Sequence, residues 1–179
     1  MSSHKEFTNS FNKGLEVERV LFDVLIEKED VLVKPMFQLG MLPNSPKYFS
    51  KTSQYSIPDF EVKRGGRTYH VDSKQKKKWV DWNGIIQTGY DYHHYQEYKE
   101  LAYQGGNRFY IFFVHTTNKT TTHRTFQKGV YVVDITRTPP DRVDDVNDDI
   151  LAFWFVDHLR KYKYSDEIIK RLQCMEDLK

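Results

Sequence analysis

The sequence has little of several features that mark particular classes of protein. It contains one cysteine, Cys174, in 179 residues, which excludes internal disulfides and cysteine-rich zinc sites and is typical of a reducing compartment. No apolar run approaches the roughly 18 residues that cross a membrane, and the polar start MSSHKEFTNS lacks the apolar segment of a signal peptide. We therefore expect a cytoplasmic protein without a membrane partner.

The sequence also lacks a large excess of positive or negative charge. Lys and Arg number 27 against 25 Asp and Glu, and a net charge of +2 is too small to indicate nucleic-acid binding by itself. Aromatic residues reach 15%, and 179 residues suffice for one hydrophobic core. We expect one domain over residues 1–179, with a core at about 11–137 and a C-terminal helical extension at about 147–179.

Apolar periodicity and turn residues predict an α/β protein built around a mixed sheet. The first half of the chain is expected to form a helix at 12–28, a strand at 31–40 interrupted by Pro35, a loop at 41–54 and a hairpin at 57–78. After a segment at 77–89 that we leave unassigned, we expect a helix at 90–106, a buried strand at 108–116, a polar loop at 117–129 and a strand at 129–137. An acidic loop at 138–149 and helices at 150–163 and 165–179 are expected to complete the chain.

The stretch IPDFEVKRGGRTYHVDSKQKKK, residues 57–78, predicts a β-hairpin. Gly65 and Gly66 lie between two runs that alternate polar and apolar residues, which is the strongest short signal for a two-residue turn. With these glycines in the turn, the predicted cross-strand pairs are Arg64 with Arg67, Val62 with Tyr69, Phe60 with Val71 and Asp59 with Asp72. Two carboxylates thus become direct neighbours.

Asp59, Asp72 and Lys74 share one face of this hairpin, because side chains alternate along a strand. Residues at facing positions have Cβ atoms about 4.5–5.5 Å apart, so two like charges there destabilise the strand pair unless another group compensates for them. A divalent cation would do so, since Mg²⁺ accepts hard oxygen ligands and often binds through one or two carboxylates with several waters. The alternative is a register shifted by one or two residues, with both aspartates as solvated charges at strand ends.

A third carboxylate, Glu18, falls on the apolar face of the helix at 12–28. At about 100° per residue, Glu18 lies between Leu25 and Phe22, inside the arc of apolar side chains. A carboxylate on a buried face needs a partner, which can be a lysine or arginine, backbone donors or a metal site. The functional interpretation is that Glu18 completes the site of Asp59 and Asp72.

Three short segments together resemble the PD-(D/E)xK nuclease superfamily. They are KGLEVERVL, which contains Glu18, the pair Pro58-Asp59 and the triplet Asp72-Ser73-Lys74. The first segment looks especially like that of archaeal-type Holliday-junction resolvases, and the order of expected elements matches the αβββαβ core of the superfamily. The resemblance covers roughly residues 14–115. It implies a restriction-endonuclease-like α/β fold, with a mixed β-sheet flanked by helices, to which this chain adds C-terminal helices.

The resemblance also implies a role for each matching residue. Asp59 and Asp72 would bind Mg²⁺ directly, helped by the Ser73 carbonyl, and Mn²⁺ would substitute for it. Glu18 would bind through water or hold a second ion, and Lys74 would orient the attacking water and stabilise charge on the phosphorane. This chemistry suits phosphodiester hydrolysis, which needs a metal to polarise the phosphoryl oxygen and a positive group near the developing charge.

Basic and amide side chains near this site are candidates for contacting DNA phosphates. They are Arg64 and Arg67 beside the hairpin turn, Lys76, Lys77 and Lys78 after Lys74, and Gln87. A solvated edge strand protected by lysines explains the lysine run equally well, and a surface glutamine at a helix start is the simpler interpretation of Gln87. Gln87 is followed four residues later by Asp91, so the QxxxY pattern of exonuclease branches is absent.

We therefore expect a Mg²⁺-dependent DNA endonuclease that hydrolyses phosphodiester bonds, in a phage, mobile-element or restriction context. One alternative is a Holliday-junction resolvase acting as a homodimer, so that two sites face opposed strands. Another is a non-catalytic DNA-binding or inhibitory protein on the same fold. The paired aspartates argue against the last alternative, because a binding module has no need of carboxylates that repel each other.

Overall fold

A six-stranded mixed sheet forms the centre of the protein. The computed structural model describes residues 3–36, 47–49 and 54–177, in which this sheet has the order β1-β4-β5-β8-β9-β12. Its strands are β1 (Leu32–Pro35), β4 (Phe60–Arg64), β5 (Arg67–Lys76), β8 (Arg108–His115), β9 (Gly129–Asp134) and β12 (Arg160–Lys161). Within it, β5 and β8 run parallel and the other neighbouring strands run antiparallel.

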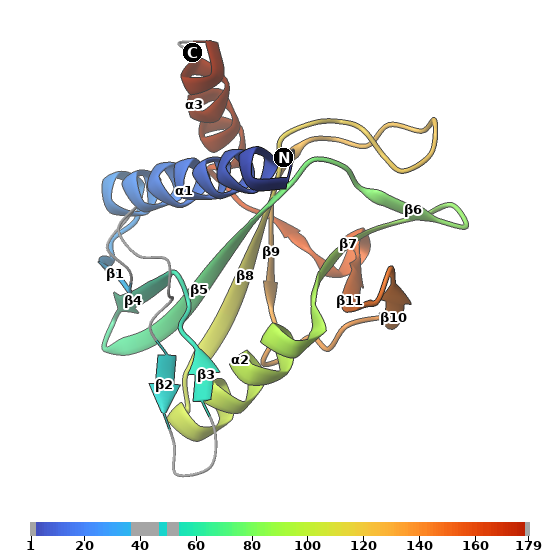
Figure 1. Cartoon of the computed structure of the whole chain (residues 1–179). Coiled ribbons are helices and arrows are strands. Elements are labelled where there is room, and N and C mark those ends of the chain that lie inside the picture. The colour runs from blue at the N-terminus through green and yellow to red at the C-terminus, as the bar shows by residue number, and fades with distance from the viewer. Residues whose placement is uncertain (1–2, 37–46, 50–53, 178–179) are drawn as a thin grey trace.

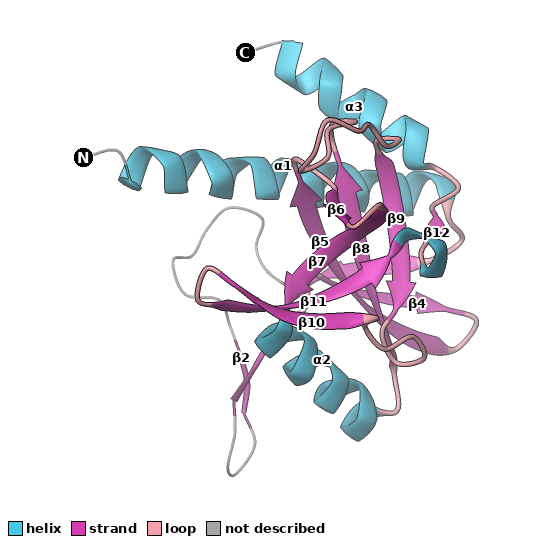
Figure 2. Ribbon diagram, turned by 90° about the vertical axis from the view of Figure 1, so that its right-hand side faces the viewer, coloured by secondary structure: helices cyan, strands magenta, loops and turns pink. Residues whose placement is uncertain are grey.

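Helices cover both faces of this sheet (Figures 1 and 2). Helices α1 (Ser3–Lys28) and α3 (Ser165–Asp177) pack on one face, and α2 (Tyr92–Gly105) packs on the other. The buried stripe of α1 is the one its spacing predicts, namely Val17, Val20, Leu21, Val24 and Leu25. The expectation of an α/β fold with a mixed sheet between helices is therefore confirmed.

A second sheet packs beside α2. It has the order β10-β11-β7-β6, from strands β6 (Val80–Trp82), β7 (Ile85–Asp91), β10 (Arg142–Val146) and β11 (Asp149–Phe155). Tyr90 of β7 and Trp154 of β11 are buried in the same core as Tyr98 of α2 and Phe113 of β8. This sheet thus places β7 next to the middle of the main sheet.

The expected order of core elements is present. The elements α1, β1, β4, β5, α2 and β8 follow one another as αβββαβ, with the β6–β7 hairpin and a small hairpin of β2 (Lys47–Phe49) and β3 (Gln54–Ser56) inserted. The expectation of a loop at 41–54 is wrong where it can be compared, because residues 47–49 form β2 and Gln54 begins β3. The rest of that loop, and residues 37–40 of the strand expected at 31–40, lie outside the described residues. Asp91 caps the start of helix α2, where its carboxylate accepts a hydrogen bond from the His94 amide, and Gly106 caps the end with φ of 63°.

The expectation of a helix at 150–163 is wrong. This segment forms β11, a short 3-10 helix at Val156–His158 and β12, while the acidic segment before it contains β10 instead of being a loop. Asn147 and Asp148 close the β10–β11 hairpin with φ of 55° and 70°, which asparagine and aspartate tolerate better than most residues. The C-terminal extension therefore contains a hairpin before the expected final helix, α3. In the part of the chain that the structure describes, no helix is long and apolar enough to cross a membrane.

Candidate active site

The β4–β5 hairpin has the register that the sequence predicts. Arg64 pairs with Arg67, Val62 with Tyr69 and Phe60 with Val71. Gly65 and Gly66 form the turn with φ of 54° and 74°, a conformation that glycine adopts without strain. The next facing position brings Asp59, which directly precedes β4, beside Asp72 in the middle of β5. The alternative of a shifted register is thereby excluded.

Asp59 is tied to the backbone of β5. Its Oδ2 accepts hydrogen bonds from the Ser73 amide at 2.7 Å and from the Ser73 hydroxyl at 2.8 Å. Burial raises the pKa of Asp59 well above its usual range, and the charges of Asp72 and Glu18 raise it further, while the two bonds from Ser73 oppose the shift. In this structure Ser73 contacts Asp59 through its amide and hydroxyl groups, whereas the resemblance gives the Ser73 carbonyl a metal-binding role.

Two tyrosines hold Asp72, which is 7% exposed. The Tyr90 hydroxyl, from β7, donates to Oδ2 at 2.7 Å, and the Tyr98 hydroxyl, from α2, donates to Oδ1 at 3.0 Å. A carboxylate oxygen accepts more than one hydrogen bond or ligand, so each oxygen retains capacity for another. Burial raises the pKa of Asp72, and the Tyr90 bond, the Lys74 charge and the Tyr98 bond oppose that rise.

No local pattern in the sequence indicates that these tyrosines contact Asp72. Tyr98 lies on the buried face of α2, where an aromatic residue is expected to be core. Tyr90 falls at the start of the helix expected at 90–106, but it lies in β7 instead. Burial raises the pKa of both phenols well above 10, so both remain protonated donors at neutral pH. Their hydroxyls fix the plane of the Asp72 carboxylate from two different elements.

Glu18 of α1 and Lys74 of β5 complete the group. Burial raises the pKa of Glu18 to about 7, the Asp72 charge adds to the rise, and the Lys74 charge opposes it. These interactions show that the three carboxylates of Glu18, Asp59 and Asp72 lie within electrostatic reach of one another. Lys74 is exposed and lies two residues beyond Asp72, on the same face of β5.

The chemistry of this donor set fits a divalent cation. Carboxylate oxygens are hard ligands, and a cation would offset the cost of burial that raises the pKa of all three groups, together with the carboxylate repulsion that raises the pKa of Glu18 and Asp59 further. Among the residues that the structure describes, no three His, Cys, Asp or Glu side chains are grouped so that they could hold one metal ion together. A cation contacted directly by Asp59 and Asp72 alone would need waters to complete its shell, as Mg²⁺ accepts.

The basic candidates for DNA contact fall at the two ends of β5. Arg64 and Arg67 flank the hairpin turn, where Arg64 Nη1 lies 3.7 Å from Glu29 Oε2 and Arg67 lies five positions, or roughly 16 Å, from Asp72. Lys77 and Lys78 are exposed beyond the other end. Lys76 is partly buried, and burial followed by the nearby Lys74 charge lowers its pKa to about 8. The arginines are thus remote from the carboxylates, whereas the lysines continue the strand that bears Asp72.

Gln87 does not have the environment expected for it. It lies in β7, paired with Val80 of β6 and Phe155 of β11, and it is fully buried at 0% exposure. The expectation of a surface glutamine at a helix start is wrong, because Gln87 lies within strand β7 and its side chain is buried. A side chain without exposed surface also offers DNA nothing to contact, so Gln87 does not belong with the candidate DNA-binding residues.

Comparison with known proteins gives a distant structural likeness. No family model matches the sequence, and no curated protein matches it significantly. Among solved structures, the chain is similar to the 1.6 Å structure of Hjc, a Holliday junction resolvase from the archaeal hyperthermophile Archaeoglobus fulgidus, with 12% sequence identity, a TM-score of 0.42, and coverage of 74% of this chain and 84% of that chain.

Proposed function

We propose that this protein is a metal-dependent nuclease that hydrolyses phosphodiester bonds in DNA. The observation that carries the proposal is the β4–β5 register, which continues to Asp59 beside Asp72, two carboxylates that Ser73, Tyr90 and Tyr98 orient, with the exposed Lys74 two residues beyond Asp72. Glu18 of α1 lies within electrostatic reach of both aspartates. Burying like charges together destabilises a fold, so a purely structural role does not account for the arrangement. A bound cation and the phosphate it recruits do account for it.

Each residue would have a distinct part in the reaction. A divalent cation, when bound, polarises the phosphoryl oxygen and lowers the pKa of a water molecule. Asp59 and Asp72 hold the cation, and their orientation is fixed by hydrogen bonds from Ser73, Tyr90 and Tyr98. Preoriented ligands of this kind lose little freedom when the metal or substrate binds.

Lys74 and Glu18 act on the substrate side of this pair. The Lys74 ammonium is exposed on the same face as Asp72, where it stabilises negative charge that develops on the phosphate. Glu18 orients a water molecule, because its carboxylate on α1 lies within electrostatic reach of Asp72 and Lys74. The proposal thus assigns metal binding to β5 and the residue before β4, and water positioning to α1.

The test is a cleavage assay with supercoiled plasmid, linear duplex, single strands and a four-way junction, in Mg²⁺, Mn²⁺ or EDTA. We expect cutting in either metal and none in EDTA. Asp59→Asn and Asp72→Asn should abolish cutting, and Lys74→Ala should slow it about 100-fold or more because it removes charge stabilisation in the transition state. A preference for the junction over the duplex would identify a resolvase.

A matched control is Asp148→Asn, which removes a carboxylate of the exposed β10–β11 turn and should cut as the parent does. The proposal is wrong if no substrate is cut in either metal, or if Asp72→Asn cuts as fast as this control. Retained DNA binding without cutting would favour the non-catalytic alternative.

A further inference from the structure

Two segments that are distant in sequence form one projection beyond β5 and β8. The first, residues 76–86, includes the turn of the β6–β7 hairpin, and the second is residues 116–126 (Figure 1). Backbone hydrogen bonds join them, from the Trp79 amide to the Lys119 carbonyl at 2.8 Å and from the Thr121 amide to the Trp79 carbonyl at 2.9 Å. We call these two segments the clasped arm.

The base of the clasped arm is part of the hydrophobic core. Trp79 is fully buried and stacks on His115 of β8, with ring centroids 3.5 Å apart and planes 3° from parallel. Phe126 and Tyr131 pack edge-on against the same indole, each with centroids 4.9 Å away. The arm is therefore anchored to the main sheet by a packed aromatic cluster and projects from a fixed position.

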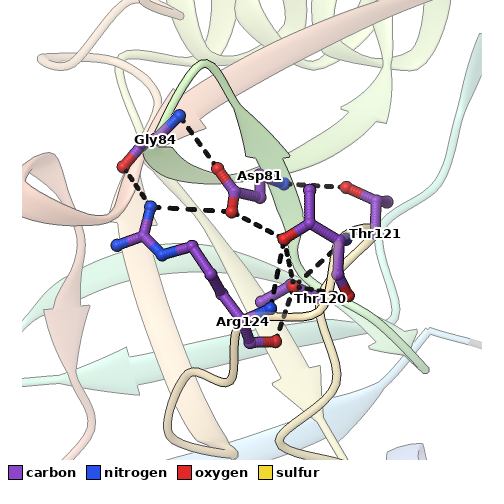
Figure 3. A network of polar contacts seen from close by, with 6 residues as sticks. Asp81, Gly84, Thr120, Thr121 and Arg124 are labelled. Carbon is purple, nitrogen blue, oxygen red and sulfur yellow. Dashed lines mark hydrogen bonds and ion pairs between the residues drawn. The ribbon is translucent and has the colours of Figure 1, made fainter.

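The tip of the clasped arm is closed by polar contacts, which Figure 3 shows from close by. Asp81 accepts hydrogen bonds from the Gly84 amide at 3.0 Å and from the Thr122 hydroxyl at 2.8 Å. Arg124 donates to the Gly84 carbonyl at 2.8 Å and lies 3.5 Å from Asp81 Oδ2. Asp81 and Arg124 thus bind the two segments together and offset each other's charge.

The remaining charge of the clasped arm is basic and faces solvent. Residues 76–86 and 116–126 contain five Lys or Arg and a single acidic residue, Asp81, which Arg124 already pairs. Lys77, Lys78 and Lys119 are all exposed. The β10–β11 hairpin, at the opposite edge of the sheet from β6, is acidic, with exposed aspartates at 144, 145, 148 and 149. A polyanion would therefore be attracted to the arm and repelled by that hairpin.

We infer that the clasped arm binds the phosphate backbone of duplex DNA on one side of the bond to be cut. The inference rests on the proposed nuclease function for the position of that bond. Lys76 lies four residues beyond Asp72 on one strand, roughly 13 Å at about 3.3 Å per residue. This distance equals about four base-pair steps of duplex DNA. Lys77, Lys78 and Lys119 then contact phosphates at least that far from the cut.

Arg124 has a different role in this scheme from the lysines. Its guanidinium holds the tip of the arm and does not contact DNA, whereas the lysines have no such contact with Asp81. A preformed arm binds with less loss of conformational entropy than two free loops. Loss of Arg124 should therefore weaken binding without removing a phosphate contact.

The experiment measures the Kd for a fluorescent duplex of about 30 base pairs, in EDTA so that nothing is cut, between about 50 and 200 mM salt. Each phosphate contact contributes about 0.9 to the slope of log affinity against log salt. We expect the triple variant Lys77→Ala, Lys78→Ala, Lys119→Ala to bind more weakly, with a slope shallower by about 2 to 3. The control triple variant Lys63→Ala, Lys99→Ala, Lys170→Ala removes exposed lysines of β4, α2 and α3 and should keep the slope of the parent.

The role of Arg124 is tested separately with Arg124→Ala. We expect lower affinity with an unchanged slope, and a slope shallower by about 0.9 would overturn the assignment because it would mean direct phosphate contact. Melting curves of each variant verify folding. An arm variant with the slope of the parent, or a control that loses as much slope as the arm variant, would overturn the inference.

The outcome is independent of the cleavage assay, because binding is measured without metal. If the salt slope depends on the clasped arm but no substrate is cut, DNA binding by the arm is supported and the proposed nuclease activity is rejected. If cleavage requires Asp72 but the salt slope does not depend on the arm, the nuclease activity is supported and DNA binding by the arm is rejected.

Discussion

Asp59 and Asp72 are each held by two hydrogen bonds from neutral donors, Ser73 on one side and Tyr90 and Tyr98 on the other. Neutral donors orient a carboxylate while leaving its negative charge in place. Lys74 offsets part of that charge but is exposed, so solvent screens it. Fixed oxygens with uncompensated charge are what a cation site requires.

The first prediction at the scale of residues concerns Glu18, whose pKa rises from its ordinary 4.5 to about 7 on folding. The folded protein holds this proton more tightly than the unfolded chain, so the associated stability is full below about pH 4.5 and is lost as the pH rises through about 7. In metal-free protein, Glu18→Gln should therefore raise the free energy of unfolding by about 1–3 kcal/mol near pH 8 and change it little near pH 4.5.

Urea denaturation at the two pH values, in EDTA, measures this difference. Asp148→Asn serves again as the control and should alter stability little at either pH. An equal gain from Glu18→Gln at both pH values would show that burial alone, without ionisation, sets the stability at this position.

The second residue-scale prediction concerns Tyr98. Tyr98→Phe removes the hydroxyl that donates to Asp72 Oδ1 and keeps the ring, which stacks on Phe109 with centroids 4.2 Å apart. Since groups that orient metal ligands typically contribute 10-fold to 100-fold to affinity, we expect about that increase in the Mg²⁺ concentration for half-maximal cleavage. Metal-dependent shifts of the melting temperature provide a readout apart from activity. Tyr103→Phe, in the same helix and 86% exposed, is the control and should leave both unchanged.

At the scale of elements, β7 depends on a close approach to β11. A Cβ added at Gly89 would lie 2.7 Å from Cε1 of Phe153, whose ring is covered by the guanidinium of Arg142 at 4.5 Å. Because the ring cannot move away freely, Gly89→Ala should destabilise the protein by about 1–3 kcal/mol in urea denaturation. The double variant Gly89→Ala, Phe153→Leu should recover part of the loss. A single variant as stable as the parent would contradict this account of the β7–β11 contact.

The elements that the sequence predicted well have strong local signals. The glycine pair at 65–66 and the alternating strands beside it fix the β4–β5 register within about 15 residues. Strand β11 is not predicted from the sequence because Ala152, Phe153 and Trp154 are all buried, so its residues show no alternation of polar and apolar side chains. The β6–β7 turn at Asn83 and Gly84 has a recognisable hairpin signal, but β6 is only three residues long and too short to show a pattern.

Some residues of the candidate site can be predicted from local patterns in the sequence, and others cannot. Asp59, Asp72 and Lys74 follow from the hairpin register, and Glu18 follows from the helical wheel of α1. The register of the hairpin is confirmed, whereas the joint action of these residues on a metal stays a prediction. The contacts of Tyr90 and Tyr98 with Asp72, and the burial of Gln87, depend on how α2 and the second sheet pack on β5, which no local pattern encodes.

At the scale of the whole molecule, metal binding should stabilise the fold. A ligand that binds only the folded state at 100 times its Kd adds about 2.7 kcal/mol to the free energy of unfolding. We expect Mg²⁺ to raise the melting temperature more near pH 8 than near pH 5, because protons compete with the metal for the same carboxylates. Differential scanning calorimetry of the parent and of the Asp59→Asn, Asp72→Asn double variant measures this. Equal stabilisation of both proteins would place the metal elsewhere.

The acidity of the β10–β11 hairpin also has a consequence for contacts between molecules. β10 is the outer strand of the second sheet, and an open strand edge can accept a strand from another chain. Its exposed Val143 and Val146 favour such pairing, but Asp144 and Asp145 lie between them. Two copies paired through this edge would bring aspartates into facing positions, where like charges destabilise the pair. Neutralising these two residues would leave an apolar open edge, the usual starting point for sheets that grow from one molecule to the next.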